Sequence, residues 1–363
     1  MPLPPLTDLP SLDVPPGPRR AEPLPADRPV RWGILATGKI AEAFVTDLAL
    51  LEECQVVAAG ARKQESADAF TARHGIPQAY GDYRSLVEDP DVDVVYVASP
   101  HGLHREHAEL ALRAGKAVLC EKAFTINAAE AEGLVALARE RDLFLMEAMW
   151  MRCSPLIRRL QQLIATGDLG EVRAVHADLG FLADLPSTDR LLDPALGGGA
   201  TLDLGVYLLT LAQVFLGEPR EVTATAVMSE RGADLNLALA LSYPRGGVAS
   251  LTASLSSWVP STAWIATDRG RVEIPAPFFN APEATWLDVA ADPEGEPEPQ
   301  PITVDRLGQG YTHEALEVVR CLRNGETESP LVSLEDTVAM MRLMDRVRRQ
   351  IGLRYEADRS AAG

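Results

Sequence analysis

The stretch that decides the fold lies near the N-terminus and reads Val30-Arg31-Trp32-Gly33-Ile34-Leu35-Ala36-Thr37-Gly38-Lys39-Ile40-Ala41. Its first six residues predict a buried strand, and the small residues that follow predict a tight turn into a helix. Dinucleotide sites need such a turn, because pyrophosphate must approach the free N–H groups of the helix start. Ala36 replaces the first Gly of the usual G-x-G-x-x-G/A pattern, so a plain strand-to-helix turn is the alternative. The candidate cofactor residues here are Ala36, Thr37, Gly38, Lys39 and Ile40.

Short apolar runs alternate with amphipathic segments from this stretch to about residue 150. This alternation is typical of βαβ units, and it predicts an α/β domain over residues 29–150 with a Rossmann-type, doubly wound parallel sheet. Two helices with recognisable ends are expected between the strands, at Leu103–Ala114 and Ala128–Arg141. The predicted strands are Val30–Leu35, Gln55–Ala61, Asp93–Ala98, Ala117–Cys120 and Leu143–Ala148.

The pattern changes after Arg152. One helix is expected at Pro155–Ala165, and the runs that follow alternate with a period near two, which is typical of an antiparallel sheet with one covered face. They are Val172–Leu182, Val222–Met228, Leu235–Tyr243 and Val248–Ser257. We therefore predict an α+β domain over residues 151–355, built on a large, mostly antiparallel open sheet. An exposed loop at Asp292–Pro301 and helices at Thr312–Arg323 and Leu334–Ile351 are expected near its end.

Composition excludes several classes of protein. The formal net charge of −18 over 363 residues disfavours a nucleic-acid partner, which would require a basic face. No run of about 18 apolar residues is evident, so no membrane span is expected. Residues 1–28 are Pro-rich and are expected to form a disordered tail without a signal sequence. The four cysteines show no CxxC spacing, which is typical of thiols in a reducing compartment, and a cytoplasmic location is expected.

The end of the second predicted strand indicates the cofactor. An NAD-selective site would carry an acidic residue there to bind the ribose 2′-hydroxyl, but this sequence has Arg62 and Lys63. A guanidinium can bind a 2′-phosphate through two hydrogen bonds, so the pair favours NADP. The alternative is that both are solvated basic residues at a helix entry.

Four further stretches carry a resemblance to the Gfo/Idh/MocA oxidoreductases, most of all to their branch of dihydrodiol dehydrogenases and NADP-dependent D-xylose dehydrogenases. The resemblance spans about Pro29 to Tyr355. It rests on Tyr96-Val97-Ala98-Ser99-Pro100-His101 with His104, on Glu121-Lys122-Ala123, on Glu147-Ala148-Met149-Trp150-Met151-Arg152, and on Gly197-Gly198-Gly199 running to Asp203-Leu204-Gly205-Val206-Tyr207. Ala123 stands where the family usually has Pro.

The resemblance implies roles for most of these residues. Lys122 is expected beside the nicotinamide and the reacting carbon, where it orients the substrate and tunes Tyr207. Tyr207 is expected to handle the hydroxyl proton, and Asp203 to hold the arrangement. The cofactor side is expected to include Ser99, Pro100, His101, His104 and Glu121. From spacing alone, Tyr207 could equally be a core residue and Asp203 a helix-start acid. The His101, His104 and His107 run has no completing ligand, so no metal is expected.

The resemblance also implies a substrate pocket and an assembly. Trp150, Arg152 and Phe279 are expected to line the pocket for an aldose, polyol or trans-dihydrodiol-like substrate, although Trp150 could serve interdomain packing instead. The open sheet of such domains commonly pairs subunits, so a homodimer or homotetramer is expected. The alternatives are a ketoreductase of a nucleotide-linked deoxysugar, a non-catalytic NADP-sensing regulator, and a redox-assisted glycosidase that holds NAD tightly.

Overall fold

The computed structural model of the chain describes residues 3, 16–18, 21–182, 190–291 and 296–360. The chain divides into two compact units, which are described separately. The N-terminal unit contains Val14–Cys153 and Leu307–Met341, and the C-terminal unit contains Ser154–Arg306 and Arg342–Gly363.

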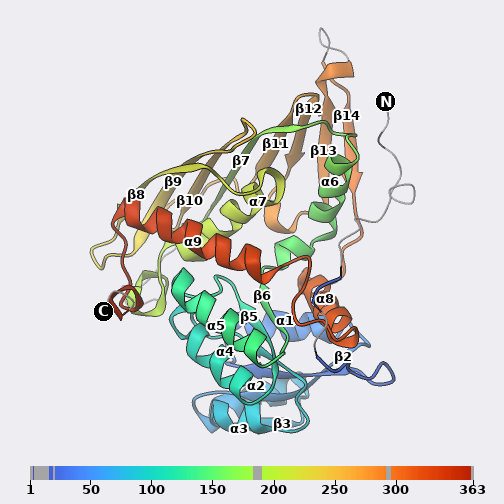
Figure 1. Ribbon diagram of the computed structural model, residues 1–363, viewed down its shortest axis with the longest axis vertical. Helices are drawn as coiled ribbons and strands as arrows, with labels where there is room; N and C mark the ends of the chain where they lie inside the picture. The colour runs from blue at the N-terminus through green and yellow to red at the C-terminus, as the bar shows by residue number, and fades with distance from the viewer. Residues whose placement is uncertain (1–2, 4–15, 19–20, 183–189, 292–295, 361–363) are drawn as a thin grey trace. The chain divides into compact units, whose positions relative to one another are not determined.

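A six-stranded parallel sheet forms the centre of the N-terminal unit, and it confirms the predicted doubly wound fold (Figure 1). The strand order is β3-β2-β1-β4-β5-β6, the order of a Rossmann sheet, in which ligands bind beyond the carboxyl ends of the strands. The sequence did not predict β3, which has only three residues, none of them fully buried. The strands are β1 (Val30–Leu35), β2 (Cys54–Gly60), β3 (Gln78–Tyr80), β4 (Val94–Val97), β5 (Ala117–Glu121) and β6 (Leu145–Ala148).

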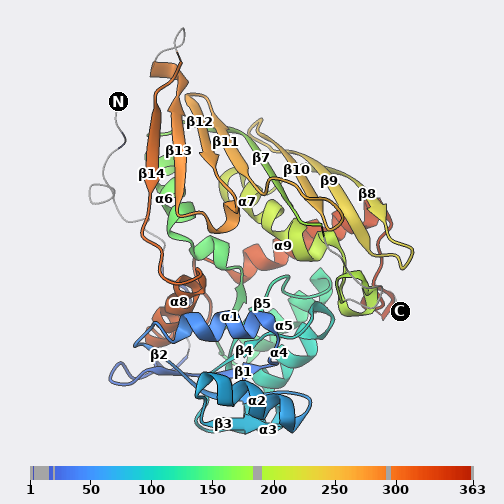
Figure 2. The same ribbon diagram turned by 180° about the vertical axis from the view of Figure 1, so that it is seen from behind.

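Helices cover both faces of this sheet. Helices α4 and α5 lie over the face seen in Figure 1, and α1 lies over the face seen in Figure 2. Each turns apolar residues toward the sheet, such as Phe44 and Leu48 of α1, which are fully buried. The helices of this unit are α1 (Lys39–Leu48), α2 (Gln64–His74), α3 (Tyr83–Glu88), α4 (His104–Arg113), α5 (Ala128–Glu140), α8 (Tyr311–Arg323) and the first part of α9 (Leu334–Ile351).

Helix α8 corrects the predicted domain boundary. The sequence placed residues 151–355 in one domain, but Leu307–Met341 belong to the N-terminal unit. The physical reason is the buried carboxylate of Asp47 on α1, which accepts hydrogen bonds from the backbone N–H groups of Gln309 and Tyr311 at 2.8 and 2.9 Å. These bonds satisfy N–H groups at the start of α8 and attach it to α1.

The described part of the predicted tail also belongs to this unit. The Pro18 carbonyl accepts from the N–H of Thr327 at 2.8 Å, and the N–H of Leu24 donates to the Leu322 carbonyl at 3.0 Å. The described residues from Pro18 to Leu24 therefore contact the end of α8 and the residues after it instead of forming a free tail. Residues 1–2, 4–15 and 19–20 lie outside the described residues.

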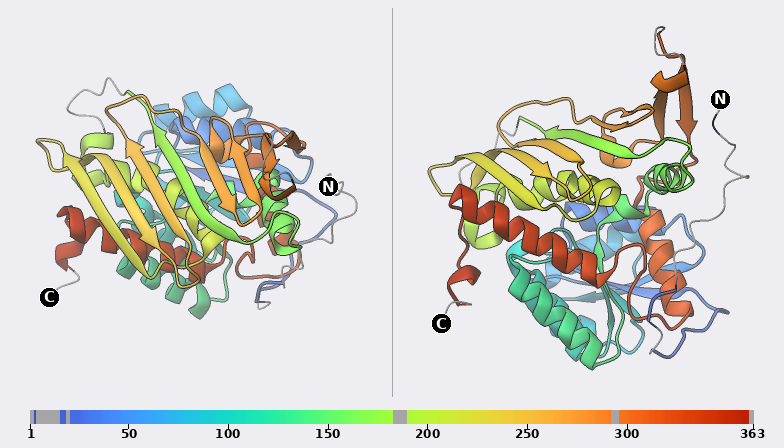
Figure 3. Two further views of the ribbon diagram at one scale, coloured as in Figure 1. Left: turned by 90° about the horizontal axis from the view of Figure 1, so that it is seen from above. Right: turned by 45° about the horizontal axis from the view of Figure 1, so that its top comes forward.

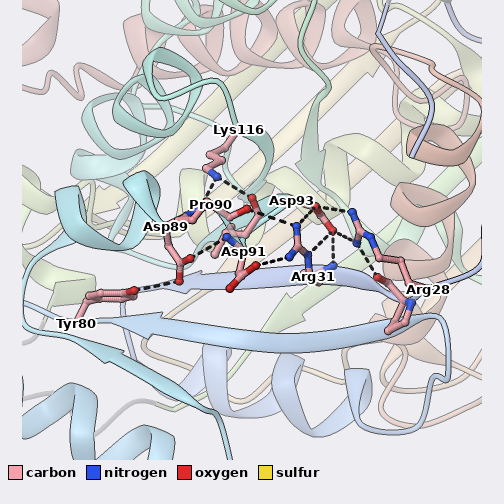
Figure 4. Close-up of polar contacts among 10 residues, drawn as sticks. Arg28, Arg31, Tyr80, Asp89, Pro90, Asp91, Asp93 and Lys116 are labelled. Atoms are coloured by element: carbon pink, nitrogen blue, oxygen red, sulfur yellow. Dashed lines mark hydrogen bonds and ion pairs between the residues drawn. The ribbon is translucent and has the colours of Figure 1, made fainter. Parts of the chain in front are cut away.

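A network of charged groups closes the amino edge of the parallel sheet (Figure 4). The carboxylate of Asp93, just before β4, forms ion pairs with Arg28 at 2.5 Å and with Arg31 at 3.1 Å. Arg31 also forms an ion pair with Asp91 at 2.6 Å. The ammonium of Lys116, just before β5, donates to the carbonyl oxygens of Asp89 and Val92 at 2.6 and 2.8 Å. These contacts join the loops that precede the strands.

The C-terminal unit is built on an eight-stranded sheet in the order β14-β13-β12-β11-β7-β10-β9-β8. Only β7 and β10 pair in parallel among its described strand pairs, so the predicted mostly antiparallel sheet is confirmed. The sequence did not predict the run of short strands from β11 to β14. The strands are β7 (Val172–Gly180), β8 (Glu221–Met228), β9 (Asp234–Ser242), β10 (Val248–Ser254), β11 (Ala263–Thr267), β12 (Gly270–Ile274), β13 (Glu283–Asp288) and β14 (Pro299–Thr303).

The prediction of an exposed loop at Asp292–Pro301 is partly wrong. Strand β14 begins at Pro299 and pairs with β13 at the edge of the sheet, where a Pro is tolerated because one side of the strand donates no hydrogen bond. Residues 292–295 lie outside the described residues.

One face of the large sheet is covered within its own unit and the other is open. Helix α7 (Val206–Leu216) packs on β7 and β10, while the opposite face, turned toward the viewer in the left panel of Figure 3, has no helix of this unit over it among the described residues. Among the described residues, the helical segment Pro194–Leu216 is long and apolar enough to cross a membrane by length and composition alone. However, 78% of its most apolar window is buried, as in the core helix of a folded domain.

Candidate functional site

The turn after β1 has the backbone of a phosphate-binding turn. Ala36 adopts a left-handed conformation with φ of 77°, the geometry in which the usual Gly is favoured. Gly38 precedes the first turn of α1 and caps it without any side-chain hydrogen bond, and a Cβ at Gly38 would meet no atom within 4 Å. The N–H groups of Lys39 and Ile40 thus begin a helix next to open space, as an anionic ligand requires.

Two exposed cations follow β2 at the same edge of the sheet. Arg62 and Lys63 lie between β2 and α2, and Lys63 is the residue before the helix starts. The charge of Arg62 lies close enough to Tyr83 and His107 to oppose protonation of the histidine, although burial is the larger cause of the lowered pKa of His107. The Tyr83 and His107 rings meet edge to face with their centres 4.7 Å apart. The charge of Arg62 therefore acts on the Tyr83 and His107 pair.

The histidine run after β4 holds the backbone around Lys122. His101 Nε2 lies 3.1 Å from the carbonyl oxygen of Lys122, and His104 lies between the carbonyls of Ser99 and Ala123 at 2.7 and 3.0 Å. Burial lowers the pKa of His104 to about 3, whereas the hydrogen bonds to main-chain carbonyls act in the opposite direction. His104 is fully buried; its ring nitrogens contact main-chain carbonyls, and its ring meets that of His101 edge to face with centres 5.5 Å apart. Among the described residues, no cluster of His, Cys, Asp or Glu side chains has the arrangement of a metal site.

Lys122 itself follows the last residue of β5, at the carboxyl edge of the parallel sheet. Glu121 is buried beside it, with one carboxylate oxygen accepting from the Lys122 N–H at 3.2 Å and the other from the Tyr96 hydroxyl at 2.5 Å. The Lys122 side chain is half-buried. Both main-chain polar groups of Lys122 therefore have partners, which fixes the direction in which its side chain leaves the strand.

The strand beside β5 supplies a second set of contacts. Glu147 on β6 accepts from the N–H of Phe124 at 3.1 Å and from the Thr337 hydroxyl at 3.0 Å. Arg152, predicted to line the substrate pocket, forms an ion pair with Asp336 at 3.2 Å at the start of α9. The structure thus gives Arg152 a partner in its own unit that the sequence did not suggest.

Trp150 forms an aromatic contact at the same end of β6. Its indole lies in the short helical turn Trp150–Cys153, is 95% buried, and packs against the Tyr311 ring with centres 4.7 Å apart. Tyr311 in turn meets Phe44 of α1. Packing within the N-terminal unit therefore accounts for part of the burial of Trp150.

The glycine run in the C-terminal unit allows close backbone approach, as predicted. Gly197 and Gly199 adopt positive φ values of 78° and 130°, and a Cβ at Gly199 would lie 2.0 Å from a carboxylate oxygen of Asp234. That carboxylate accepts from both the N–H and the hydroxyl of Thr201, at 2.7 and 2.6 Å. The run is therefore packed directly against the start of β9.

Asp203 and Tyr207 follow this run at the start of α7. Asp203 lies in a π-helical turn, Thr201–Gly205, and Tyr207 lies in the first turn of the α-helix, so the predicted spacing crosses a change of helix type. The Asp203 carboxylate is 4.0 Å from the guanidinium of Arg190. The Tyr207 ring packs against Phe279 with centres 5.0 Å apart. The structure therefore brings Tyr207 and Phe279 together in one unit, while Lys122 belongs to the other.

Three of the supporting residues, Tyr96, Glu147 and Asp234, have no role that the sequence predicted. Tyr96 and Glu147 stood within the quoted motifs, and the signal that could have identified them is a polar side chain inside an otherwise apolar strand. Asp234 starts a strand like many surface acids, so nothing in the sequence distinguishes it.

Comparisons with known proteins agree with this geometry. Residues 30–149 match the family described as "Oxidoreductase family, NAD-binding Rossmann fold", and residues 157–273 match the "GFO/IDH/MocA C-terminal domain". Together the two matches cover most of both predicted domains.

Several curated relatives share one name. The trans-1,2-dihydrobenzene-1,2-diol dehydrogenase of Mus musculus is 36% identical over 342 residues, covering 91% of this chain and 99% of the relative. That of Homo sapiens is 36% identical over 334 residues with the same coverage.

Solved structures of similar proteins share the fold over nearly the whole chain. The 3-ketoreductase KijD10 of Actinomadura kijaniata, in complex with NADP and TDP-benzene, gives a TM-score of 0.79 with 28% identity, covering 89% of this chain and 98% of its own. The aldose-aldose oxidoreductase of Caulobacter crescentus, complexed with glycerol, gives 0.80 with 25% identity, covering 89% and 97%. The chain belongs to the Gfo/Idh/MocA family of oxidoreductases, whose members are NAD(P)-dependent enzymes acting on CH–OH groups.

Proposed function

We propose that the chain is an NADP-dependent oxidoreductase that interconverts a hydroxyl and a carbonyl on an aldose, polyol or trans-dihydrodiol-like substrate. The observation that carries the proposal is the retention of Lys122, Asp203 and Tyr207, with Lys122 held at the carboxyl edge of the parallel sheet and Phe279 against Tyr207. The identity of over a third to dihydrodiol dehydrogenases along the whole fold supports the substrate class.

The turn around Ala36 fits a dinucleotide. The first turn of α1 offers backbone N–H groups beside open space at Gly38, which suits a pyrophosphate. Arg62 is exposed at the end of β2, where its guanidinium would bind a 2′-phosphate and where an acidic residue would repel it. Ser99, Pro100, His101 and Glu121 shape the neighbouring loop, and we propose that His104 acts by holding that loop.

The bound cofactor supplies the hydride acceptor or donor, and the protein supplies the proton transfer and the positioning. Tyr207 would take the proton of the substrate hydroxyl as a phenolate during oxidation, and as a neutral phenol it would return the proton during reduction. The Lys122 ammonium would hydrogen-bond the same oxygen and stabilise the negative charge that develops on it. Asp203 would orient the second hydroxyl. Trp150 and Phe279 would offer aromatic faces to the apolar side of a ring.

A site built to hydrogen-bond two adjacent hydroxyls should reject analogues that lack one, because buried polar groups would be left unpaired. The test is a 340 nm assay with NADP on trans-1,2-cyclohexanediol, D-xylose and cyclohexanol. We expect kcat/KM for the vicinal diols to exceed that for cyclohexanol by about 10²-fold or more. Comparable values would exclude recognition of adjacent oxygens, and no turnover on any alcohol, sugar or ketose would favour a sensing role.

A second candidate is favoured by the similarity to KijD10, solved with a TDP-linked ligand. The same residues would then reduce a ketone on a nucleotide-linked deoxysugar. Oxidation of NADPH by a TDP-linked ketosugar, at a kcat/KM far above that for free sugars and diols, would select this candidate over the first.

We also propose that two or four copies of the chain assemble through the open face of the eight-stranded sheet. Its outward residues are mostly small or uncharged, such as Thr223, Ala238, Ala240 and Thr252. Light scattering after size exclusion should give a mass of two or four chains, and Ala240→Arg should shift it to one.

A further inference from the structure

One buried carboxyl group near Lys122 has no role in the proposed chemistry. Glu147 sits on β6, next to β5, and is 3% exposed. Burying a carboxyl group is costly unless it is hydrogen-bonded, so the contacts of Glu147 indicate its role.

The two oxygens of Glu147 join segments that lie far apart in the sequence. One accepts from the N–H of Phe124, two residues after Lys122, and the other is 3.0 Å from the hydroxyl of Thr337 on α9. On the other side of Lys122, Glu121 and His101 hold its N–H and carbonyl. The main chain that carries Lys122 is therefore fixed from both sides, and Glu147 is the contact that links it to α9.

The charges around Glu147 allow it to exist in two protonation states. Burial raises the pKa of its carboxyl group to about 7, with Glu121 acting in the same direction, whereas the hydrogen bonds from Thr337 and Phe124 and the charge of Arg152 act against it. Buried Cys120 also lies nearby, and Arg152 is itself paired with Asp336. When protonated, Glu147 can donate to the Thr337 hydroxyl while still accepting from Phe124, which is the pattern an isosteric Gln would reproduce.

We propose that Glu147 is a positioning residue for Lys122, which acts through the backbone of Phe124 and keeps the lysine ammonium aligned with the reacting oxygen. This inference rests on the proposed function of Lys122. Misplacement of a catalytic group by about an ångström can lower turnover by about 10²-fold, so loss of this contact should act on kcat more than on cofactor binding.

Three variants of the full-length protein test the proposal. Glu147→Ala should lower kcat at least 10-fold and leave the Kd for NADPH within 3-fold. Glu147→Gln should restore kcat to within 3-fold of wild type, and Thr337→Val, which removes only the second contact, should give an intermediate loss. A readout besides activity is the rate at which an amine-reactive reagent modifies Lys122, followed by peptide mass spectrometry, which should change in Glu147→Ala and return in Glu147→Gln.

Glu317→Ala is the matched control, because Glu317 is a buried carboxylate of the same unit whose partners are Arg320 and Ser329. It should lower Tm without lowering kcat.

The proposal is overturned if Glu147→Ala and Thr337→Val both keep kcat within 3-fold, if Glu317→Ala lowers kcat as much as Glu147→Ala, or if Glu147→Gln fails to restore turnover and Lys122 modification. Failure of the proposed function is a separate result, namely a Lys122→Met protein as active as wild type.

Discussion

The two edges of the six-stranded sheet use polar residues in opposite ways. At the amino edge, Arg28 and Arg31 pair directly with Asp91 and Asp93, so charges are satisfied by opposite charges near solvent (Figure 4). At the carboxyl edge, buried side chains bond to main-chain groups around Lys122. The first edge therefore stabilises loops, whereas the second fixes the position of one side chain. Substitutions at the two edges should therefore affect different measurements.

The largest difference should come from two lysines, one at each edge. Lys122→Met removes an ammonium from the proposed chemistry and should lower kcat by about 10²–10⁴-fold while the fold and NADPH binding persist. Lys116→Met removes an ammonium that donates to the Asp89 and Val92 carbonyls, so it should lower Tm and leave kcat within a few-fold. Steady-state kinetics and thermal melts check both variants. A Lys122→Met protein with near-normal kcat would show that the two edges of the sheet do not differ in their effect on catalysis.

The next largest effect should be on cofactor affinity, at Arg62, which follows β2 at the carboxyl edge of the sheet. Arg62→Asp should weaken NADPH binding by about 10- to 100-fold, the value of a lost hydrogen bond between charged groups, and should change NADH binding far less. Arg84→Asp, an exposed cation on α3 of the same unit, is the control. Fluorescence titration measures both cofactors. Equal affinities of the wild type for NADH and NADPH would contradict the choice of NADP.

A smaller effect is expected at the amino edge, on stability alone. Asp93→Asn should reduce the free energy of unfolding by about 1–3 kcal/mol at pH 7 and leave kcat within a few-fold. Burial tends to raise the pKa of Asp93, but hydrogen bonds from Arg28 and Arg31 prevail and lower it below 3.8. The contribution of Asp93 is thus complete above its unfolded pKa near 4 and is lost as the pH falls through the lower folded value. Urea denaturation at pH 7 and pH 3 should show the difference between variant and wild type shrinking in acid; a constant difference would argue against the ion pairs.

The smallest effect is expected at the phosphate-binding turn. Ala36 adopts a φ of 77°, which costs an alanine more than a glycine, although glycine loses more freedom on folding. Ala36→Gly should therefore raise the free energy of unfolding by up to about 1 kcal/mol and leave kcat unchanged within a few-fold. A decrease in stability would show that the left-handed turn carries no strain.

The sequence predicted elements that are continuous along the chain and missed contacts between distant segments. Val30–Leu35 is a strand with the predicted bounds, because a short, mostly apolar run before a turn of small residues leaves little alternative. Glu147 and Thr337, however, are 190 residues apart, and no local pattern links them. The return of Leu307–Met341 to the N-terminal unit escaped prediction for the same reason, since it depends on the contact of Asp47 with the start of α8.

The central claim is that hydride passes between NADPH and a carbon that Lys122 and Tyr207 help to activate. The most direct test is reduction of a hydroxyketone or ketosugar with NADPH carrying deuterium at C4, in each of its two stereochemical forms, with mass analysis of the product. We predict one deuterium on the new carbinol carbon from one form only, with a rate at least about 10²-fold lower in Lys122→Met. Product without deuterium from both forms, or equal rates in the two proteins, would contradict the claim.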